Sequence, residues 1–414
     1  MNTPLVDKVL AQVSEEGIVE MSKDVISICT PTGFEEPMAD YMKQTFDEMG
    51  LRVSWQQVEE GRANVIGVKE GVGRGKSLMF NGHMDTSYTG QETHLTGIGY
   101  KPFPVVKDGV IYGLGIYNMK GALVCYTQAL KAVMAAGVKL EGDVIIAAVA
   151  GEIEKSQWGT DFVGPEYRGY GAGTHYMVNH GFIPDMCILG EPTDMKMVLG
   201  HFGSMWVRIT THGPYMHTGF STGRQHENAI HRMRRVMDAI AEWIPSWEEK
   251  AAYGGKNGIV NLGCVQGGYP WRASRLPDRC DVFLDVRVPP AMRMADAARD
   301  IKGLVMKLRQ SYPDHGVEYE IFVTAPGAEI SADHPLVKAI AESHEAVLGG
   351  PPETDTVIWS SDASVMTRYG IETINYGPSS GVRKADGEKV PIQVMSDITK
   401  VYARVICDIC GVAS

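Results

Sequence analysis

Three side chains that can carry proton or metal chemistry come shortly after apolar, strand-like segments of the chain. They are His83 after 78–80, Glu152 after 144–150 and Glu191 after 186–189. Imidazole and carboxylate groups transfer protons and bind metal ions. In α/β sheets, ligands collect at the edge where the parallel strands end. We therefore expect these three groups to meet in an active site.

The elements that must position these groups alternate between strand and helix patterns in the first half of the chain. Helices are predicted over 9–28, 37–49 and 120–136, and strands over 64–68, 77–81 and 143–150. Strands that alternate with helices indicate an α/β fold, with a central, mostly parallel sheet covered by helices on both faces.

The pattern changes near Gly203. The later segments predict strands over 206–211, 259–265, 279–288 and 317–323, and helices over 228–244 and 291–308. This β-α-β-β-α-β order is typical of a ferredoxin-like α+β domain. We therefore predict a catalytic domain formed by 1–203 and 324–414, with an inserted domain over 204–323.

Composition limits the classes of partner and compartment. A chain of 414 residues exceeds the roughly 250–300 residues of a single domain. Its net charge of −11 argues against nucleic acid and anionic membranes, which require basic patches. No signal peptide or membrane span is found, and seven cysteines without a disulfide pattern favour the cytoplasm. We interpret the C-x-x-C pair Cys407 and Cys410 as helix packing.

Four motifs resemble, in order and spacing, those of the M20 family of metallopeptidases and amidohydrolases. They are NGHMDT at 81–86, GLGIYNMKG at 113–121, GEPT at 190–193 and YGPSSGVRKADGEKV at 376–390. The resemblance covers nearly all of the chain. It implies a metal-dependent hydrolase in which the inserted domain is a lid and a dimerisation domain.

The resemblance also implies roles for individual residues. His83 and Glu191 are metal ligands, and Asp85 holds the imidazole in the required tautomer. Glu152 is the general base. His217 resembles a lid histidine that reaches the partner subunit's site and stabilises the oxyanion there. We therefore expect a homodimer formed through the lid.

The chain departs from the family pattern at three positions that serve one of two metals. Asn118 stands where the family has a bridging aspartate, and an amide oxygen is a neutral, weaker donor. Ile153 separates two glutamates that are adjacent in the family, the second being Glu154 here. Lys384 falls where the family has a histidine, and no histidine follows His344. Because all three changes concern the same ion, we interpret them as the loss of one metal.

Alternatives remain open at these three positions. Asn118 is a ligand of the remaining metal, a group next to its ligands, or the N-cap of the helix that follows. Glu154 is a ligand if the backbone shifts its register, and otherwise part of a solvated turn. Lys384 either supplies a fixed cation where the second metal was, or is a loop lysine in water.

We therefore predict a mononuclear metal hydrolase with one divalent ion per subunit, zinc or manganese. With the assistance of Glu152, a metal-bound water attacks a carbon–nitrogen bond of a small amide, carbamate or arylamine. Rings near the motifs favour an aromatic substrate, unless they are core packing; they are Tyr88, Trp158, Tyr215, Trp271 and Trp359. The alternative function is a catalytically inactive binding protein.

Overall fold

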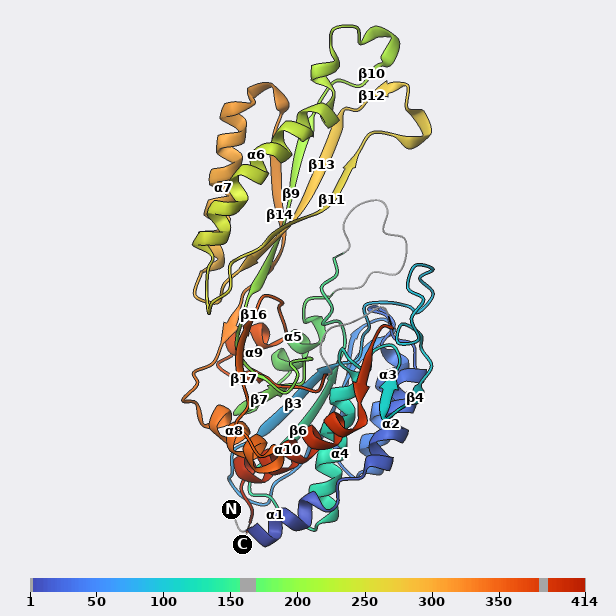
Figure 1. The fold of residues 1–414 in the computed structure, drawn as a ribbon, viewed down its shortest axis with the longest axis vertical. Helices are drawn as coiled ribbons and strands as arrows, with labels where there is room; N and C mark the ends of the chain where they lie inside the picture. The colour runs from blue at the N-terminus through green and yellow to red at the C-terminus, as the bar shows by residue number, and fades with distance from the viewer. Residues whose placement is uncertain (1–2, 157–168, 380–385, 414) are drawn as a thin grey trace. The chain divides into compact units, whose positions relative to one another are not determined.

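A computed structural model describes residues 3–156, 169–379 and 386–413, and the chain divides into two compact units (Figure 1). The first unit comprises Met1–Leu199, Glu329–Asp355 and Ser361–Ser414, and the second comprises Gly200–Ala328 and Thr356–Ser360. The predicted insertion over 204–323 lies inside the second unit. That unit also takes in 356–360, a segment far along the chain that we placed in the catalytic domain.

The first unit is built on a large sheet that the described residues form with nine strands. Its spatial order is β1 (Arg52–Glu59), β2 (Arg62–Lys69), β6 (Val144–Val149), β3 (Leu78–His83), β7 (Met186–Leu189), β17 (Glu372–Asn375), β8 (Met197–His201) and β15 (Ala328–Glu329), and β16 (Thr354–Val357) pairs with β8. The four central strands, β6 to β17 in this order, are parallel to one another. The predicted α/β fold with a mostly parallel central sheet is confirmed.

Helices cover both faces of this sheet, because alternate residues of its strands point to opposite sides. In β6, residues 144, 146 and 148 belong to the larger core, and residues 145, 147 and 149 belong to a second core. The larger core includes α4 and α10, and the second core includes α5 and α9 (Figure 1). The helices of this unit are α1 (Thr3–Leu10), α2 (Glu15–Ser27), α3 (Glu36–Glu48), α4 (Lys120–Ala135), α5 (Ala172–Asn179), α8 (Pro335–Leu348), α9 (Ala363–Arg368) and α10 (Ile392–Cys410).

The helix predicted over 9–28 is wrong in its first part, because the structure breaks it into α1 and α2. The hydroxyl of Ser14 accepts a hydrogen bond from the backbone N–H of Gly17 at 3.0 Å, so Ser14 is the N-cap of α2. Two acidic residues follow in the first turn, Glu15 and Glu16, where they stabilise the helix N-terminus. A helix start signal therefore interrupts what we interpreted as one continuous helix.

The second unit is an antiparallel sheet with two helices packed on one face. Its strands lie in the order β11 (Val260–Gly267), β13 (Arg279–Val288), β9 (Gly203–His212) and β14 (Glu318–Ala325), and its helices are α6 (Ala229–Lys250) and α7 (Met294–Ser311). In β13, residues 282, 284, 286 and 288 join the core beneath these helices. The chain order β9-α6-β11-β13-α7-β14 is the predicted β-α-β-β-α-β order. A two-stranded ribbon pairs β10 (Met216–His217) with β12 (Arg275–Leu276).

The structure shows how the cysteines are placed and how long the apolar helices are. All seven cysteines are free thiols. Cys407 and Cys410 are buried in the core of the first unit on α10, which agrees with the packing interpretation. Within the described ranges, the structure has no helix that is both long and apolar enough to span a membrane.

Candidate metal centre

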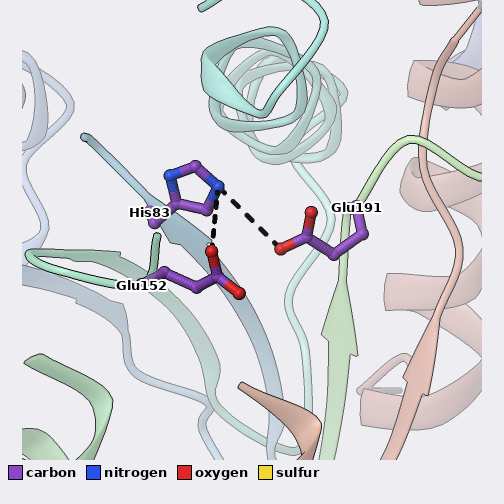
Figure 2. Close-up of side chains that lie close together, drawn as sticks. All are labelled: His83, Glu152 and Glu191. Atoms are coloured by element: carbon purple, nitrogen blue, oxygen red, sulfur yellow. Dashed lines mark ion pairs between the residues drawn. The ribbon is translucent and has the colours of Figure 1, made fainter. Parts of the chain in front are cut away.

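Three parallel strands deliver the central residues of the site. His83 is the last residue of β3, Glu152 lies three residues after the end of β6, and Glu191 lies two residues after the end of β7. Strand β3 pairs with both β6 and β7, so the three strands end side by side. The three side chains point toward one another, as Figure 2 shows. The predicted convergence of polar groups at strand ends is therefore present in the structure.

The geometry of these side chains suits a metal ion. His83 Nε2 lies 3.7 Å from Glu152 Oε2, 3.9 Å from Glu191 Oε1 and 3.1 Å from Asn118 Oδ1. Ligand atoms about 2.0–2.2 Å from a tetrahedral zinc ion lie roughly 3.4 Å from one another. His83, Glu152 and Glu191 are respectively 1%, 9% and 5% exposed, so the group is closed to bulk water on most sides.

Asp85 ties the histidine and the glutamate segment together. Its backbone carbonyl oxygen lies 2.9 Å from His83 Nδ1, and its Oδ1 lies 3.4 Å from the same nitrogen. A proton on Nδ1 that points at Asp85 leaves the lone pair of Nε2 facing the side-chain oxygens of Asn118, Glu152 and Glu191. The Asp85 carboxylate also accepts the backbone N–H groups of Glu152 and Ile153, each at 3.1 Å. Asp85 therefore positions both the His83 imidazole and the segment that carries Glu152.

Asn118 is next to His83 and is not the N-cap of α4. Met119 occupies the N-cap position, and its side chain makes no capping hydrogen bond. The Asn118 side chain instead places Oδ1 beside His83 Nε2. Of the three interpretations of Asn118, the structure excludes the N-cap and leaves the two in which it is close to the metal position.

Buried negative charge dominates the electrostatics of the site. Burial by itself lowers the pKa of His83, but Asp85, Glu152 and Glu191 raise that pKa well above its ordinary value. Burial, followed by the charge of Glu191, raises the pKa of Glu152 well above its ordinary value. Burial also raises the pKa of Asp362 to about 7. Carboxylates in a low-dielectric interior are costly unless a cation balances them.

A divalent cation fits this donor set. It would neutralise the excess charge on the buried carboxylates, and His83, Glu191 and Asn118 would hold it through one nitrogen and two kinds of oxygen. Imidazole and carboxylate ligands together are compatible with zinc and with manganese. Within the described ranges, His83, Glu152 and Glu191 form the one group of three such residues whose donor atoms all lie within 4.8 Å.

The remaining predicted residues lie elsewhere or outside the description. Glu154 is half-buried and does not belong to that group. Lys384 and Trp158 lie outside the described residues. His217 is exposed on β10 of the second unit, where its Nδ1 accepts the N–H of Gly219 at 3.1 Å.

Two residues of the site were missed by the sequence analysis. The hydroxyl of Thr32 donates to Asp85 Oδ2 at 2.8 Å. Asp362, which is 3% exposed, accepts a 2.5 Å hydrogen bond from Thr174. Thr174 in turn accepts from the side-chain amide of Asn81, two residues before His83. The sequence signal for Asp362 is that of an N-cap, since it directly precedes α9, but its side chain makes no capping bond.

Comparisons with known proteins find matches over most of the chain. The family model of peptidase family M20/M25/M40 matches residues 79–408. The N-formyl-4-amino-5-aminomethyl-2-methylpyrimidine deformylase of Bacillus subtilis (strain 168) is 26% identical, and the alignment covers 96% of this chain and 95% of that protein. The succinyl-diaminopimelate desuccinylase of Gluconobacter oxydans (strain 621H) is 26% identical, with 79% of this chain and 80% of the relative covered.

Solved structures show the same fold. The aminopeptidase PepT of Bacillus cereus ATCC 10987 superposes with a TM-score of 0.74 at 18% identity, covering 97% of this chain and 100% of that one. At this identity the likeness concerns the fold alone. Together with the family match, it confirms the resemblance that the four motifs indicated.

Proposed function

The chain belongs to peptidase family M20/M25/M40 and is a metallohydrolase that acts on carbon–nitrogen bonds; we propose that it hydrolyses a small N-acyl compound at a site for one divalent ion. The observation that carries this proposal is the convergence of His83, Glu152 and Glu191, with 3.7 and 3.9 Å between the imidazole nitrogen and the two carboxylates.

Glu152 carries the proton transfers in this proposal. When bound, a divalent cation supplies Lewis acidity, which polarises the scissile carbonyl and lowers the pKa of a water molecule. Glu152 takes one proton from the attacking water, whose oxygen forms the new bond to the carbonyl carbon. Glu152 then returns that proton to the leaving nitrogen as the carbon–nitrogen bond breaks. The products are a carboxylic acid and an amine, so one water is consumed for each bond cleaved.

The proposal of one metal, rather than two, is supported by the residues around His83. A bridging ligand needs two anionic oxygens, and Asn118 has a single neutral one. The Asp85 carboxylate accepts the backbone N–H of Ile153 at 3.1 Å. This bond fixes Ile153, and Glu154, the next residue, lies outside the group formed by His83, Glu152 and Glu191. The same carboxylate thus favours Glu152 over Glu154 at the site.

Elemental analysis of the purified protein tests the metal count. We expect one zinc or manganese ion per chain at saturation, and loss of turnover after chelation that the same ion restores. Two ions per chain at full occupancy would show that the mononuclear site is wrong. A saturated protein that turns over no amide, carbamate or arylamine favours the alternative of an inactive binding protein.

The substrate class is proposed from the relatives. The deformylase, whose alignment covers 96% of this chain, has a name that describes removal of a formyl group from an amino-substituted pyrimidine. We therefore propose an N-formyl or other N-acyl derivative of a small aromatic amine. A panel of N-formyl aromatic amines, N-succinyl amino acids and dipeptides tests this class. If dipeptides have the highest kcat/KM, the aromatic N-acyl proposal is wrong.

The second unit is proposed to be a lid that dimerises and contributes His217 to the partner subunit's site. The exposed position of His217 supports a role outside its own fold, where it would stabilise the oxyanion of the tetrahedral intermediate. Strands β11 and β14 lie at the two edges of the four-stranded sheet, and pairing of two copies would cover such an edge.

Mixed dimers test catalysis across the dimer. His217→Ala and Glu152→Gln are each expected to have strongly reduced activity as pure proteins. Refolded together, they should form heterodimers in which one site has both residues intact, so activity should partly recover. Heterodimers that form but remain inactive would place His217 in its own subunit's site or at the interface only.

A further inference from the structure

One buried carboxylate holds the loop that carries Asn118. Glu388 is 1% exposed, and its Oε2 accepts three backbone N–H groups from this loop. The donors are Gly115 at 2.9 Å, Tyr117 at 3.2 Å and Asn118 at 3.2 Å. Converging N–H groups of this kind form an anion-binding nest. In this chain, the anion in the nest is one of the protein's own side chains.

The position of Glu388 is set by the strand that follows it. Strand β18 (Lys389–Pro391) pairs antiparallel with β5 (Val110–Tyr112), which in turn pairs with β4 (Val105–Lys107). The N–H of Gly113 also donates to the backbone oxygen of Glu388 at 3.3 Å. The start of the loop and the carboxylate that fills it are therefore fixed against the same short sheet.

The loop has little room to adopt another path. Gly115 has φ of +87°, and a Cβ added there would lie 2.9 Å from side-chain atoms of both Lys120 and Thr86. The N–H of Lys120 donates to the carbonyl oxygen of Gly115 at 2.8 Å, which connects the loop to the first turn of α4. The three bonds to Glu388 are thus part of a tightly packed turn that ends at Asn118.

Orientation matters more for Asn118 than for an anionic ligand. A neutral amide oxygen attracts a cation weakly, so a small rotation away from the metal position loses much of its contribution. The N–H of Asn118 is bonded to Glu388, and its Oδ1 lies 3.1 Å from His83 Nε2. One residue therefore links the Glu388 carboxylate to the proposed metal position.

We propose that Glu388 is a positioning residue for the metal site: its carboxylate orders the 113–119 loop so that Asn118 Oδ1 faces the same point as His83 Nε2. This inference rests on the proposed function, because that point is the proposed position of the cation. Glu388 acts through Asn118 and does not itself touch the cation. A negative charge is needed because one oxygen accepts all three N–H groups, and hydrogen bonds to an ionised acceptor are stronger than those to the neutral amide oxygen of Gln.

A double-mutant cycle in the full-length protein distinguishes this role from a contribution to stability alone. The variants are E388Q, N118A and their combination, with Mn²⁺ as the probe and its dissociation constant measured by calorimetry and by electron paramagnetic resonance. We expect E388Q to weaken Mn²⁺ binding about 10- to 100-fold, the range for groups that orient metal ligands. In the N118A background, the same substitution should change Mn²⁺ affinity by less than about twofold.

Asp143→Asn is the matched control. The carboxylate of Asp143 also accepts a backbone N–H, that of Gly71, at 2.8 Å. Asp143 directly precedes β6, whereas Glu152 follows the other end of that strand. Its substitution should leave Mn²⁺ affinity at the wild-type value. If E388Q does not fold, E388D enters the same cycle, since it keeps the charge but withdraws it by one methylene. The loss of Mn²⁺ affinity expected for E388D should likewise be absent in the N118A background.

Two outcomes of the affinity measurements would overturn the proposal. One is wild-type Mn²⁺ affinity in E388Q, and the other is a loss of affinity of equal size with and without Asn118. A wild-type chain that binds neither Mn²⁺ nor Zn²⁺ would instead refute the proposed function. Crystal structures of the metal-free wild type and E388Q then decide the positioning claim: Asn118 Oδ1 still beside His83 Nε2 in E388Q refutes it, and a displaced amide supports it.

Discussion

The two units of the chain hold their chemistry-bearing residues in opposite ways. In the first unit, His83, Glu152 and Glu191 are buried at the ends of parallel strands. In the second unit, His217 is exposed on a two-residue strand of a ribbon. We propose from this contrast a division of labour, in which the first unit holds the metal and the second unit contributes to the turnover rate.

The largest effect is expected for His83→Ala. This substitution removes the one nitrogen donor of the group, and the carboxylates that remain repel one another. We expect the protein to lose its metal and its activity to fall to background, measured by elemental analysis and turnover. His180→Ala is the control, because His180 ends α5 and its Nδ1 lies 2.7 Å from the backbone oxygen of Tyr176. Full metal occupancy in His83→Ala would contradict the site.

Glu152→Gln should lower kcat by about 10³-fold, within the range for general acid–base groups, while the metal stays bound. Glu154→Gln is the matched variant, and its kcat should remain within about twofold of wild type because Glu154 lies outside the donor group. This pair of variants tests whether Glu152 or Glu154 transfers the protons in the reaction. A larger loss in Glu154→Gln would mean that the segment shifts its register when metal and substrate bind.

His217→Ala should lower kcat by about 10²-fold, the lower end for a lost oxyanion donor, and leave the metal content unchanged. His226→Ala is the control from the same unit, since His226 lies in the exposed turn Gln225–Glu227. The metal content of His217→Ala tests whether His217 takes part in metal binding. Loss of metal in His217→Ala would show that the second unit completes the metal site, and the division of labour would be wrong.

The last prediction concerns stability without metal. Burial raises the pKa of Asp362 to about 7, so between pH 4 and 7 the folded protein keeps a proton that the unfolded chain releases. The contribution of the protonated Asp362 carboxyl to the free energy of unfolding is fully present below pH 4 and is lost as the pH rises through 7. The free energy of unfolding of wild type relative to Asp362→Asn should fall over this interval by up to about 4 kcal/mol.

Urea unfolding in a chelator, at several pH values, measures this difference. Added metal provides the internal control, because a bound cation lowers the pKa of nearby carboxylates and should flatten the pH dependence. Parallel profiles for wild type and Asp362→Asn without metal would show that Asp362 is ionised in the folded protein. Burial and the neighbouring carboxylates would then perturb the pKa of Asp362 less than we describe.

Local patterns in the sequence were sufficient for the fold and for the centre of the site. The apolar run before Glu152 predicts β6, and the structure places that strand at 144–149. Strand ends that carry His83, Glu152 and Glu191 predicted a meeting point, because parallel strands end at one edge of the sheet. The prediction of one helix over 9–28 was wrong, because it did not take account of the capping signal at Ser14, after which α2 begins.

Tertiary structure decided what surrounds these residues. Thr32 bonds to Asp85 across 53 positions, Thr174 bonds to Asp362 across 188, and the loop that carries Asn118 bonds to Glu388 across about 270. A helix or strand pattern depends on neighbours within a few residues, so the sequence by itself determined the elements and the residues at their ends. Such long-range hydrogen bonds depend on strand order and loop path, and these exist only once the sheet has assembled, when burial makes an unpaired polar group costly.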